Sequence, residues 1–82
     1  MSHRQIIDYA CCRFGVADQI VGLTDGQVYR KVAPWLQAHS LPQLRMQLQA
    51  RLPVGVDLDS VLDPAMQQQV CAVLHAWSRQ YG

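Results

Sequence analysis

The chain has 82 residues, of which 50% are hydrophobic, so it can form one domain with a real core but not two. Its formal net charge of +1 excludes a strongly basic or acidic protein, and no apolar run approaches the length of a membrane span. The N-terminus lacks the pattern of a secretion signal and the three cysteines form no even framework, so we expect a cytoplasmic protein with no membrane partner.

The first predicted helix begins at the N-terminus. Ser2 and Gln5 have the spacing of a capping box, in which each side chain bonds the backbone N–H of the other residue. Gly15 is a natural C-cap for this helix. Between them, helical spacing places five apolar residues on one broad face: Ile6, Ile7, Ala10, Cys11 and Phe14.

The next stretch has the pattern of two short helices joined by a tight turn. Val16–Val21 is predicted to form the supporting helix, and Gly22-Leu23 the turn, because glycine tolerates a positive φ. Thr24 is expected to cap a second helix that runs to about Val32. Gln27, three residues after Thr24, completes a second capping box.

The faces of this second helix differ in chemistry. Val28 and Val32 are four residues apart and are predicted to face the core, while Gln27, Arg30 and Lys31 point outward. An amide, a guanidinium and an ammonium on one face suit contact with base edges and phosphates.

Gly22-Leu23-Thr24 followed by Val28-Tyr29-Arg30 resembles the turn and recognition helix of many bacterial helix-turn-helix regulators. The spacing from Arg13 to Lys31 is also similar to the helix-turn-helix of the FlhC family of flagellar master regulators. The resemblance implies a protein that contacts double-stranded DNA. The chain departs from the pattern in three ways. Asp18 stands where a small residue is expected, Gly26 weakens the reading helix by roughly 1 kcal/mol relative to alanine, and the metal-binding cysteine region of FlhC-type proteins is not matched.

Pro34 marks the end of the reading helix or a change in its course. Proline removes a backbone donor and disfavours helix at Ala33. The helix is therefore expected to end near Pro34. Alternatively, Pro34-Trp35-Leu36 opens a new turn, or Pro34 kinks a helix that continues to about His39. We interpret Trp35 as a core or interface anchor rather than as a base-stacking group.

Two further helices are predicted, with a connection of roughly ten residues between them. Ser40 begins the first, with Pro42 in its first turn and a stripe of Leu41, Leu44, Leu48 and Leu52. In the connection, Asp57 or Asp59 is expected to begin a single helical turn that inserts Val61 and Leu62 into the core.

Asp63-Pro64 then starts the longest helix, which should run to about Gln80. It either closes the back of the helix-turn-helix unit or pairs with a symmetry mate. Gln67 falls outside its apolar stripe, which consists of Met66, Val70, Val73, Leu74, Trp77 and Tyr81.

These elements predict an all-α fold of four to five short helices in a single domain, residues 1–82, with an N-terminal tri-helical helix-turn-helix-like unit followed by C-terminal helices. The three histidines lie far apart, no paired zinc spacing is present, and there is no glycine-rich phosphate loop. We therefore expect no enzymatic activity, no cofactor and no metal.

Two functions remain open. In the first, the protein is a small transcriptional regulator, and a homodimer is expected. Gln27 and Arg30 would read bases, Lys31 and Arg4 would contact the phosphate backbone, Thr24 would also touch DNA, and Tyr29 would meet a phosphate.

The charge distribution bears on this first function. Residues 1–51, which include the candidate reading helix, hold six basic and three acidic side chains, a balance of +3. Residues 52–82 hold one basic and three acidic side chains, a balance of −2.

In the second function, the protein is a helical adaptor or inhibitor that binds another protein. The expected interface uses the leucine stripe, with Leu44 and Leu48, or the aromatic ends, Trp35 and Trp77. A third hypothesis combines the two, a domain of helix-turn-helix shape that binds protein in place of DNA.

Overall fold

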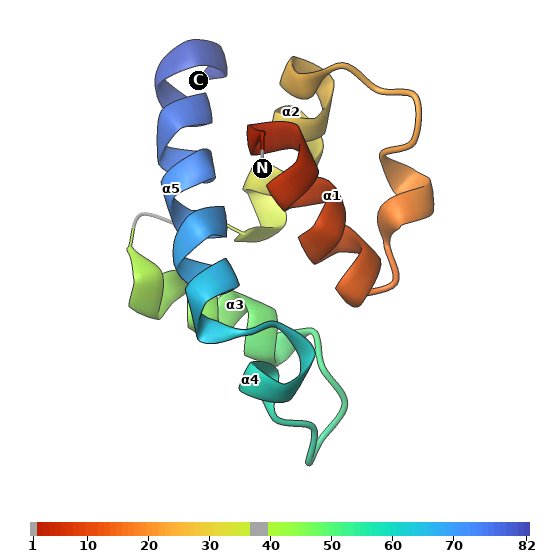
Figure 1. Cartoon of the computed structure of the whole chain (residues 1–82), viewed down its shortest axis with the longest axis vertical. Helices are drawn as coiled ribbons and strands as arrows, with labels where there is room; N and C mark the ends of the chain where they lie inside the picture. The colour runs from red at the N-terminus through yellow and green to blue at the C-terminus, as the bar shows by residue number, and fades with distance from the viewer. Residues whose placement is uncertain (1, 37–39) are drawn as a thin grey trace.

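The computed structural model describes residues 2–36 and 40–82. In chain order the elements are α1 (His3–Arg13), a 3-10 turn η1 (Ala17–Gln19), α2 (Asp25–Leu36), α3 (Leu41–Ala50), α4 (Leu58–Val61) and α5 (Pro64–Tyr81). α5 is the central element and contacts α1, α2 and α3. In Figure 1, α1 and α2 lie beside the C-terminal half of α5, and α3 and α4 lie at its N-terminal end. The predicted all-α class is confirmed for the described residues, which contain no strand.

One apolar core joins the four longer helices. The stripe predicted for α5 is confirmed, with Val70, Val73, Leu74 and Trp77 all buried. The ring of Trp77 meets Tyr81 edge-on, with ring centroids 6.1 Å apart. Leu44 and Leu48 of α3 are equally buried, at 0% and 2% exposed.

This burial corrects the predicted protein interface. Leu44, Leu48 and Trp77 were expected to meet a partner, but their side chains are covered by the protein's own helices. A helical stripe that packs within a molecule has the same spacing as one that packs on a partner, so the pattern alone does not separate them. The side chain of Trp35 lies outside the described residues.

The predicted cap of α1 is confirmed. The backbone N–H of Gln5 donates to Ser2 Oγ at 3.2 Å, and the backbone N–H of Ser2 donates to Gln5 Oε1 at 2.8 Å. Gly15, the residue after the C-cap Phe14, has a φ of 73°. α1 therefore begins where the sequence predicts and ends one residue earlier, with Phe14 rather than Gly15 as the C-cap, and its apolar face lies against α5.

The predicted supporting helix Val16–Val21 is wrong, because only Ala17–Gln19 form a single 3-10 turn. A six-residue segment does not recover the cost of starting a helix, and its β-branched residues disfavour one. Ile20 is buried and anchors the segment, whereas Val21 and Asp18 are exposed. Gly22 has a φ of 79°, as the predicted turn requires.

α2 begins as predicted but extends further. Thr24 and Gln27 form the expected capping box, with distances of 2.9 Å and 3.3 Å. The helix continues through Pro34 to Leu36 rather than ending near Val32. Because Pro34 is exposed, the carbonyl that its missing N–H leaves without a partner can be hydrated. Continuation toward His39, one of the alternatives from the sequence, lies outside the described residues beyond Leu36.

The connection before α5 is organised by a side chain that the sequence pattern missed. The helical pattern predicts that Gln67 lies outside the apolar stripe, yet Gln67 is only 1% exposed. Its Nε2 donates to the carbonyl of Leu62 at 2.7 Å and to Asp59 Oδ1 at 2.9 Å, and its Oε1 accepts from Arg45. The single turn α4 is confirmed, but it inserts Leu58 and Leu62 into the core and leaves Val61 half-buried.

Among the described helices, none is both long enough and apolar enough to cross a membrane.

Candidate nucleic-acid interface

The outward face of α2 is set by what the rest of the helix packs against. Val28 and Val32 are 0% and 1% exposed and face the core, as predicted. Gly26 faces α5, where an added Cβ would lie 3.2 Å from the Tyr81 ring. This close approach explains a glycine that the helix pattern alone disfavours. The opposite side of α2 is left to solvent.

We define the outward face of α2 as Thr24, Gln27, Arg30 and Lys31, which are all exposed. Within the described residues, neither Arg30 nor Lys31 has an ion-pair partner. Asp25 is the only carboxylate in α2, and it is turned toward Arg4. The outward face of α2 therefore carries two positive charges and no carboxylate.

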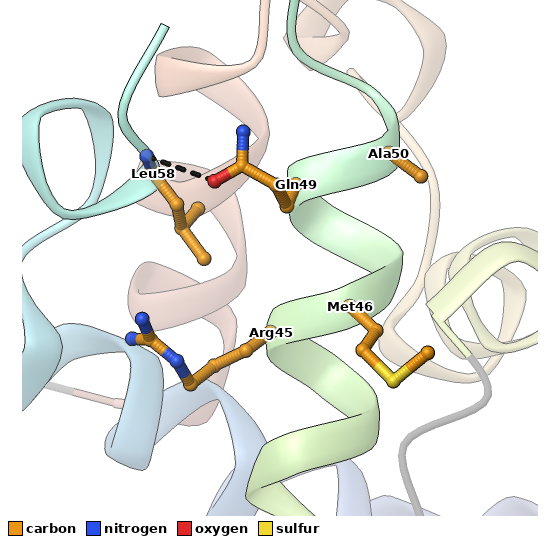
Figure 2. Close-up of a pocket in the computed structure, with 5 residues that line it drawn as sticks. All are labelled: Arg45, Met46, Gln49, Ala50 and Leu58. Atoms are coloured by element: carbon orange, nitrogen blue, oxygen red, sulfur yellow. Dashed lines mark hydrogen bonds between the residues drawn. The ribbon is translucent and has the colours of Figure 1, made fainter.

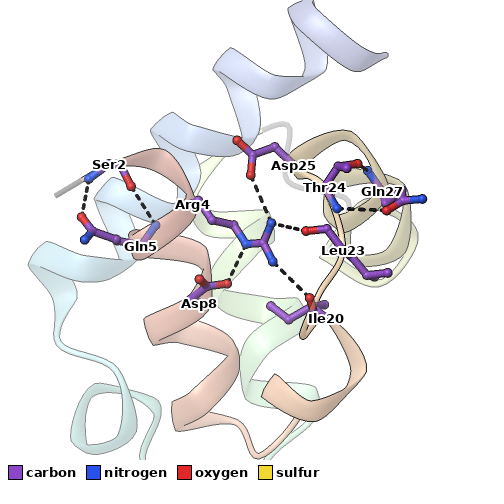
Figure 3. Close-up of polar contacts among 9 residues, drawn as sticks. All are labelled: Ser2, Arg4, Gln5, Asp8, Ile20, Leu23, Thr24, Asp25 and Gln27. Carbon is purple, nitrogen blue, oxygen red and sulfur yellow. Dashed lines mark hydrogen bonds and ion pairs between the residues drawn. The ribbon is translucent and has the colours of Figure 1, made fainter.

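The cap of α2 orients the Gln27 side chain on this face. Its Oε1 accepts the backbone N–H of Thr24 at 2.9 Å, and Thr24 Oγ accepts the backbone N–H of Gln27 (Figure 3). A backbone N–H can only donate, so the amide oxygen must point back toward the helix start. The Nε2 donors of Gln27 then remain for an external partner.

Arg4 is bound within the protein rather than presented to solvent. Its guanidinium donates to Asp8 at 2.9 Å, to Asp25 at 3.1 Å, and to the carbonyls of Leu23 and Ile20 at 2.6 Å and 3.1 Å (Figure 3). The hydrogen bond to Asp8, more than any other contact, raises the pKa of Arg4. The predicted phosphate contact is thus replaced by another role. Arg4 ties α1 to the turn and to the first residue of α2.

Tyr29 also lies away from the outward face of α2. It is half-buried, and its ring centroid is 6.3 Å from that of Tyr81 on α5. Helical geometry explains this position, because Tyr29 is three residues after Gly26 and shares the side of α2 that faces α5. The structure therefore keeps four of the six predicted DNA-contacting residues together and separates Arg4 and Tyr29 from them.

A second surface lies between α3 and the start of α4, and sequence reasoning missed it. A hollow of about 460 Å³ is lined by Arg45, Met46, Gln49, Ala50 and Leu58. Figure 2 shows Arg45 and Gln49 on one side of α3 and Met46 and Ala50 on the other. Met46 is 72% exposed. The signal in the sequence was a methionine placed off the leucine stripe.

The polar residues beside this hollow hold the connection to α3. Gln49 Oε1 accepts the backbone N–H of Leu58 at 3.2 Å (Figure 2), and its Nε2 donates to the Val56 carbonyl at 2.9 Å. Arg45 donates to Asp59 at 2.9 Å and, with a smaller contribution from Gln67, holds the pKa of that carboxyl below its ordinary value. These side chains are engaged in the fold, so Met46 and Ala50 are the groups left for contact.

The cysteines and histidines assemble no metal centre in the part of the chain that the structure describes. Cys11 and Cys71 are buried and Cys12 is exposed, all as free thiols. Burial, with a smaller contribution from Asp8, raises the pKa of Cys11 to about 11. Burial also raises the pKa of Cys71.

The buried Cys11 thiol makes stability depend on alkaline pH. Between its ordinary pKa of 9.0 and the folded value of about 11, the unfolded chain releases a proton that the folded chain keeps. The free energy of unfolding should therefore fall as pH rises through this range. Urea unfolding at several pH values measures the effect, and Cys11→Ala should show a shallower fall. An equal fall in both proteins would contradict this origin.

No family model, curated protein or solved structure matches this chain.

Proposed function

We propose that this protein binds double-stranded DNA through the outward face of α2 and acts as a small transcriptional regulator. The observation that carries the proposal is the pair of exposed cations, Arg30 and Lys31, on a helix whose one carboxylate is turned away. Duplex DNA is a dense array of phosphates, and cations that neutralise them release bound counterions. The outward face of α2 carries two cations without ion-pair partners and no carboxylate, so contact with DNA phosphates is the interaction that would stabilise a complex most.

The residues of this face have distinct roles in the proposal. Arg30 and Gln27 reach base edges, and Lys31 contacts the phosphate backbone. Arg4 positions the outward face of α2 without contacting DNA, because its hydrogen bonds to the Leu23 carbonyl and to Asp25 hold the start of α2 in place. Two cations per protomer give modest affinity, so a homodimer that places two such faces on one duplex fits the proposal.

Charge-removing variants test the proposal. Arg30→Ala and Lys31→Ala should each weaken binding to random-sequence duplex DNA several-fold at low salt, since each removes one neutralised phosphate. Arg13→Ala is the matched control. Its side chain donates to the Val61 carbonyl at 2.7 Å, which places it beside α4. In Figure 1, α4 lies apart from α2. Equal losses in all three variants would contradict a site on α2.

The alternative function is a non-enzymatic adaptor or inhibitor that binds another protein. The observation that favours it is the exposed Met46 beside the hollow between α3 and α4. Methionine side chains adapt to varied apolar partners and recur on protein-binding surfaces. Absence of DNA binding by the wild-type protein, combined with a partner whose binding is lost in Met46→Asp, would favour this function.

A further inference from the structure

We infer that the outward face of α2 reads guanine in preference to adenine, with Gln27 as the specificity-determining residue. This inference rests on the proposed function, because it assigns a base preference to the same DNA-binding face. It follows from the hydrogen-bonding groups that the fold leaves available there.

The cap of α2 orients the Gln27 amide. Glutamine ordinarily reads adenine with both ends of its amide: the oxygen accepts from N6 and the nitrogen donates to N7. Here the oxygen already accepts the backbone N–H of Thr24 at 2.9 Å. The oxygen can accept a second hydrogen bond, but the cap turns it toward the start of α2, so placing both ends of the amide on adenine requires breaking the cap.

The side chains beside Gln27 are mainly hydrogen-bond donors. Arg30 and Lys31 carry donors and no acceptors. The Thr24 hydroxyl oxygen accepts the backbone N–H of Gln27 at 3.3 Å, and Asp25 Oδ1 accepts from Arg4 at 3.1 Å. These two oxygens are thus directed to groups of the protein itself, and the long side chains that project from this face, Gln27, Arg30 and Lys31, present donors.

Guanine and adenine present different hydrogen-bonding groups in the major groove. Guanine shows two acceptors there, N7 and O6, whereas adenine shows one acceptor beside an N6 donor. A face of donors matches guanine at both positions and meets a second donor at adenine. Gln27 and Arg30 are three residues apart on one side of α2, so their side chains reach neighbouring base pairs. The expected target is a pair of adjacent guanines.

The test removes one acceptor at a time from the DNA and leaves the protein unchanged. Three random-sequence duplexes of one length are compared at one low salt concentration: unmodified, with 7-deazaguanine for every guanine, and with 7-deazaadenine for every adenine. The guanine change should weaken binding on the order of 10-fold. The adenine change should leave affinity within about 2-fold, because a donor beside N6 gains little there.

A variant assigns the effect to Gln27. Gln27→Ala keeps the Thr24 hydroxyl cap on the backbone N–H of residue 27, and alanine favours helix. Its loss on 7-deazaguanine DNA should be smaller than the wild-type loss, because only Arg30 then reads guanine. Circular dichroism and thermal unfolding check that the variant is folded.

The outcomes separate this inference from the proposed function. Binding to unmodified DNA with equal losses on the two modified duplexes, or a larger loss with 7-deazaadenine, would overturn the guanine preference and leave DNA binding in place. The same holds if neither modification matters, since phosphates alone would then be contacted. No binding to unmodified DNA would overturn both.

Discussion

Trp77→Ala is expected to lower the free energy of unfolding by about 3–5 kcal/mol, the range for truncating a large buried aromatic residue. Trp77 is 2% exposed, and it packs in the core on the central helix α5 and edge-on against Tyr81. A domain of this size has little stability to spare, so the variant should be largely unfolded at 37 °C. Urea unfolding monitored by circular dichroism measures the change.

Met46→Ala is the matched control for Trp77→Ala. Met46 is also a large apolar residue, but it is 72% exposed, so its loss should change stability by no more than about 0.5 kcal/mol. If Trp77 served an interface between molecules, its replacement would leave the unfolding of the dilute monomer almost unchanged. That result would contradict the core position described above.

Arg4→Met is expected to lower the free energy of unfolding by about 2 kcal/mol. The substitution keeps much of the aliphatic length but removes every donor of the guanidinium. The carbonyls of Leu23 and Ile20 and the carboxylates of Asp8 and Asp25 then lose their shared partner. The start of α2 should loosen, so DNA affinity should also fall. Thermal unfolding and duplex binding report the two effects.

Arg30→Met separates the role of Arg4 from a general effect of losing an arginine. The same substitution at this exposed residue should leave stability within about 0.5 kcal/mol and reduce only DNA binding. If the two variants lost equal stability, the contacts of Arg4 with the turn would contribute nothing specific.

Most of the helical framework could be predicted because it rests on local rules. The capping boxes at Ser2 and Thr24, and the Asp63-Pro64 start of α5, depend on residues within one helical turn. The apolar stripe of α5 has helical spacing that only a helix would bring to one side.

The rest depended on contacts between residues far apart in the chain. The helical pattern predicts a surface position for Gln67, but its amide is buried among Arg45, Asp59 and the Leu62 carbonyl. The segment before Gly22 places only Ile20 in the core, and the Ile20 carbonyl accepts from the Leu23 backbone N–H and from Arg4, so no regular helix is required there. Local propensity contains none of this information.

The candidate site was partly predictable for the same reason. Helical spacing alone puts Gln27, Arg30 and Lys31 on one side of α2, and the structure leaves all three exposed. Arg4 was assigned to DNA from its charge, and only the tertiary contacts reveal that its donors are used. Tyr29 turns toward α5 because Gly26 lets Tyr81 approach, a contact between distant parts of the chain.

The measurement that tests the account most directly is the binding of the wild-type protein to random-sequence duplex DNA across a salt series. If Arg30 and Lys31 neutralise two phosphates, the logarithm of affinity should fall against the logarithm of salt with a slope of about −2 per protomer, and about −4 for a dimer. Absence of binding at about 50 mM salt, or binding that salt leaves unchanged, would contradict DNA recognition by α2.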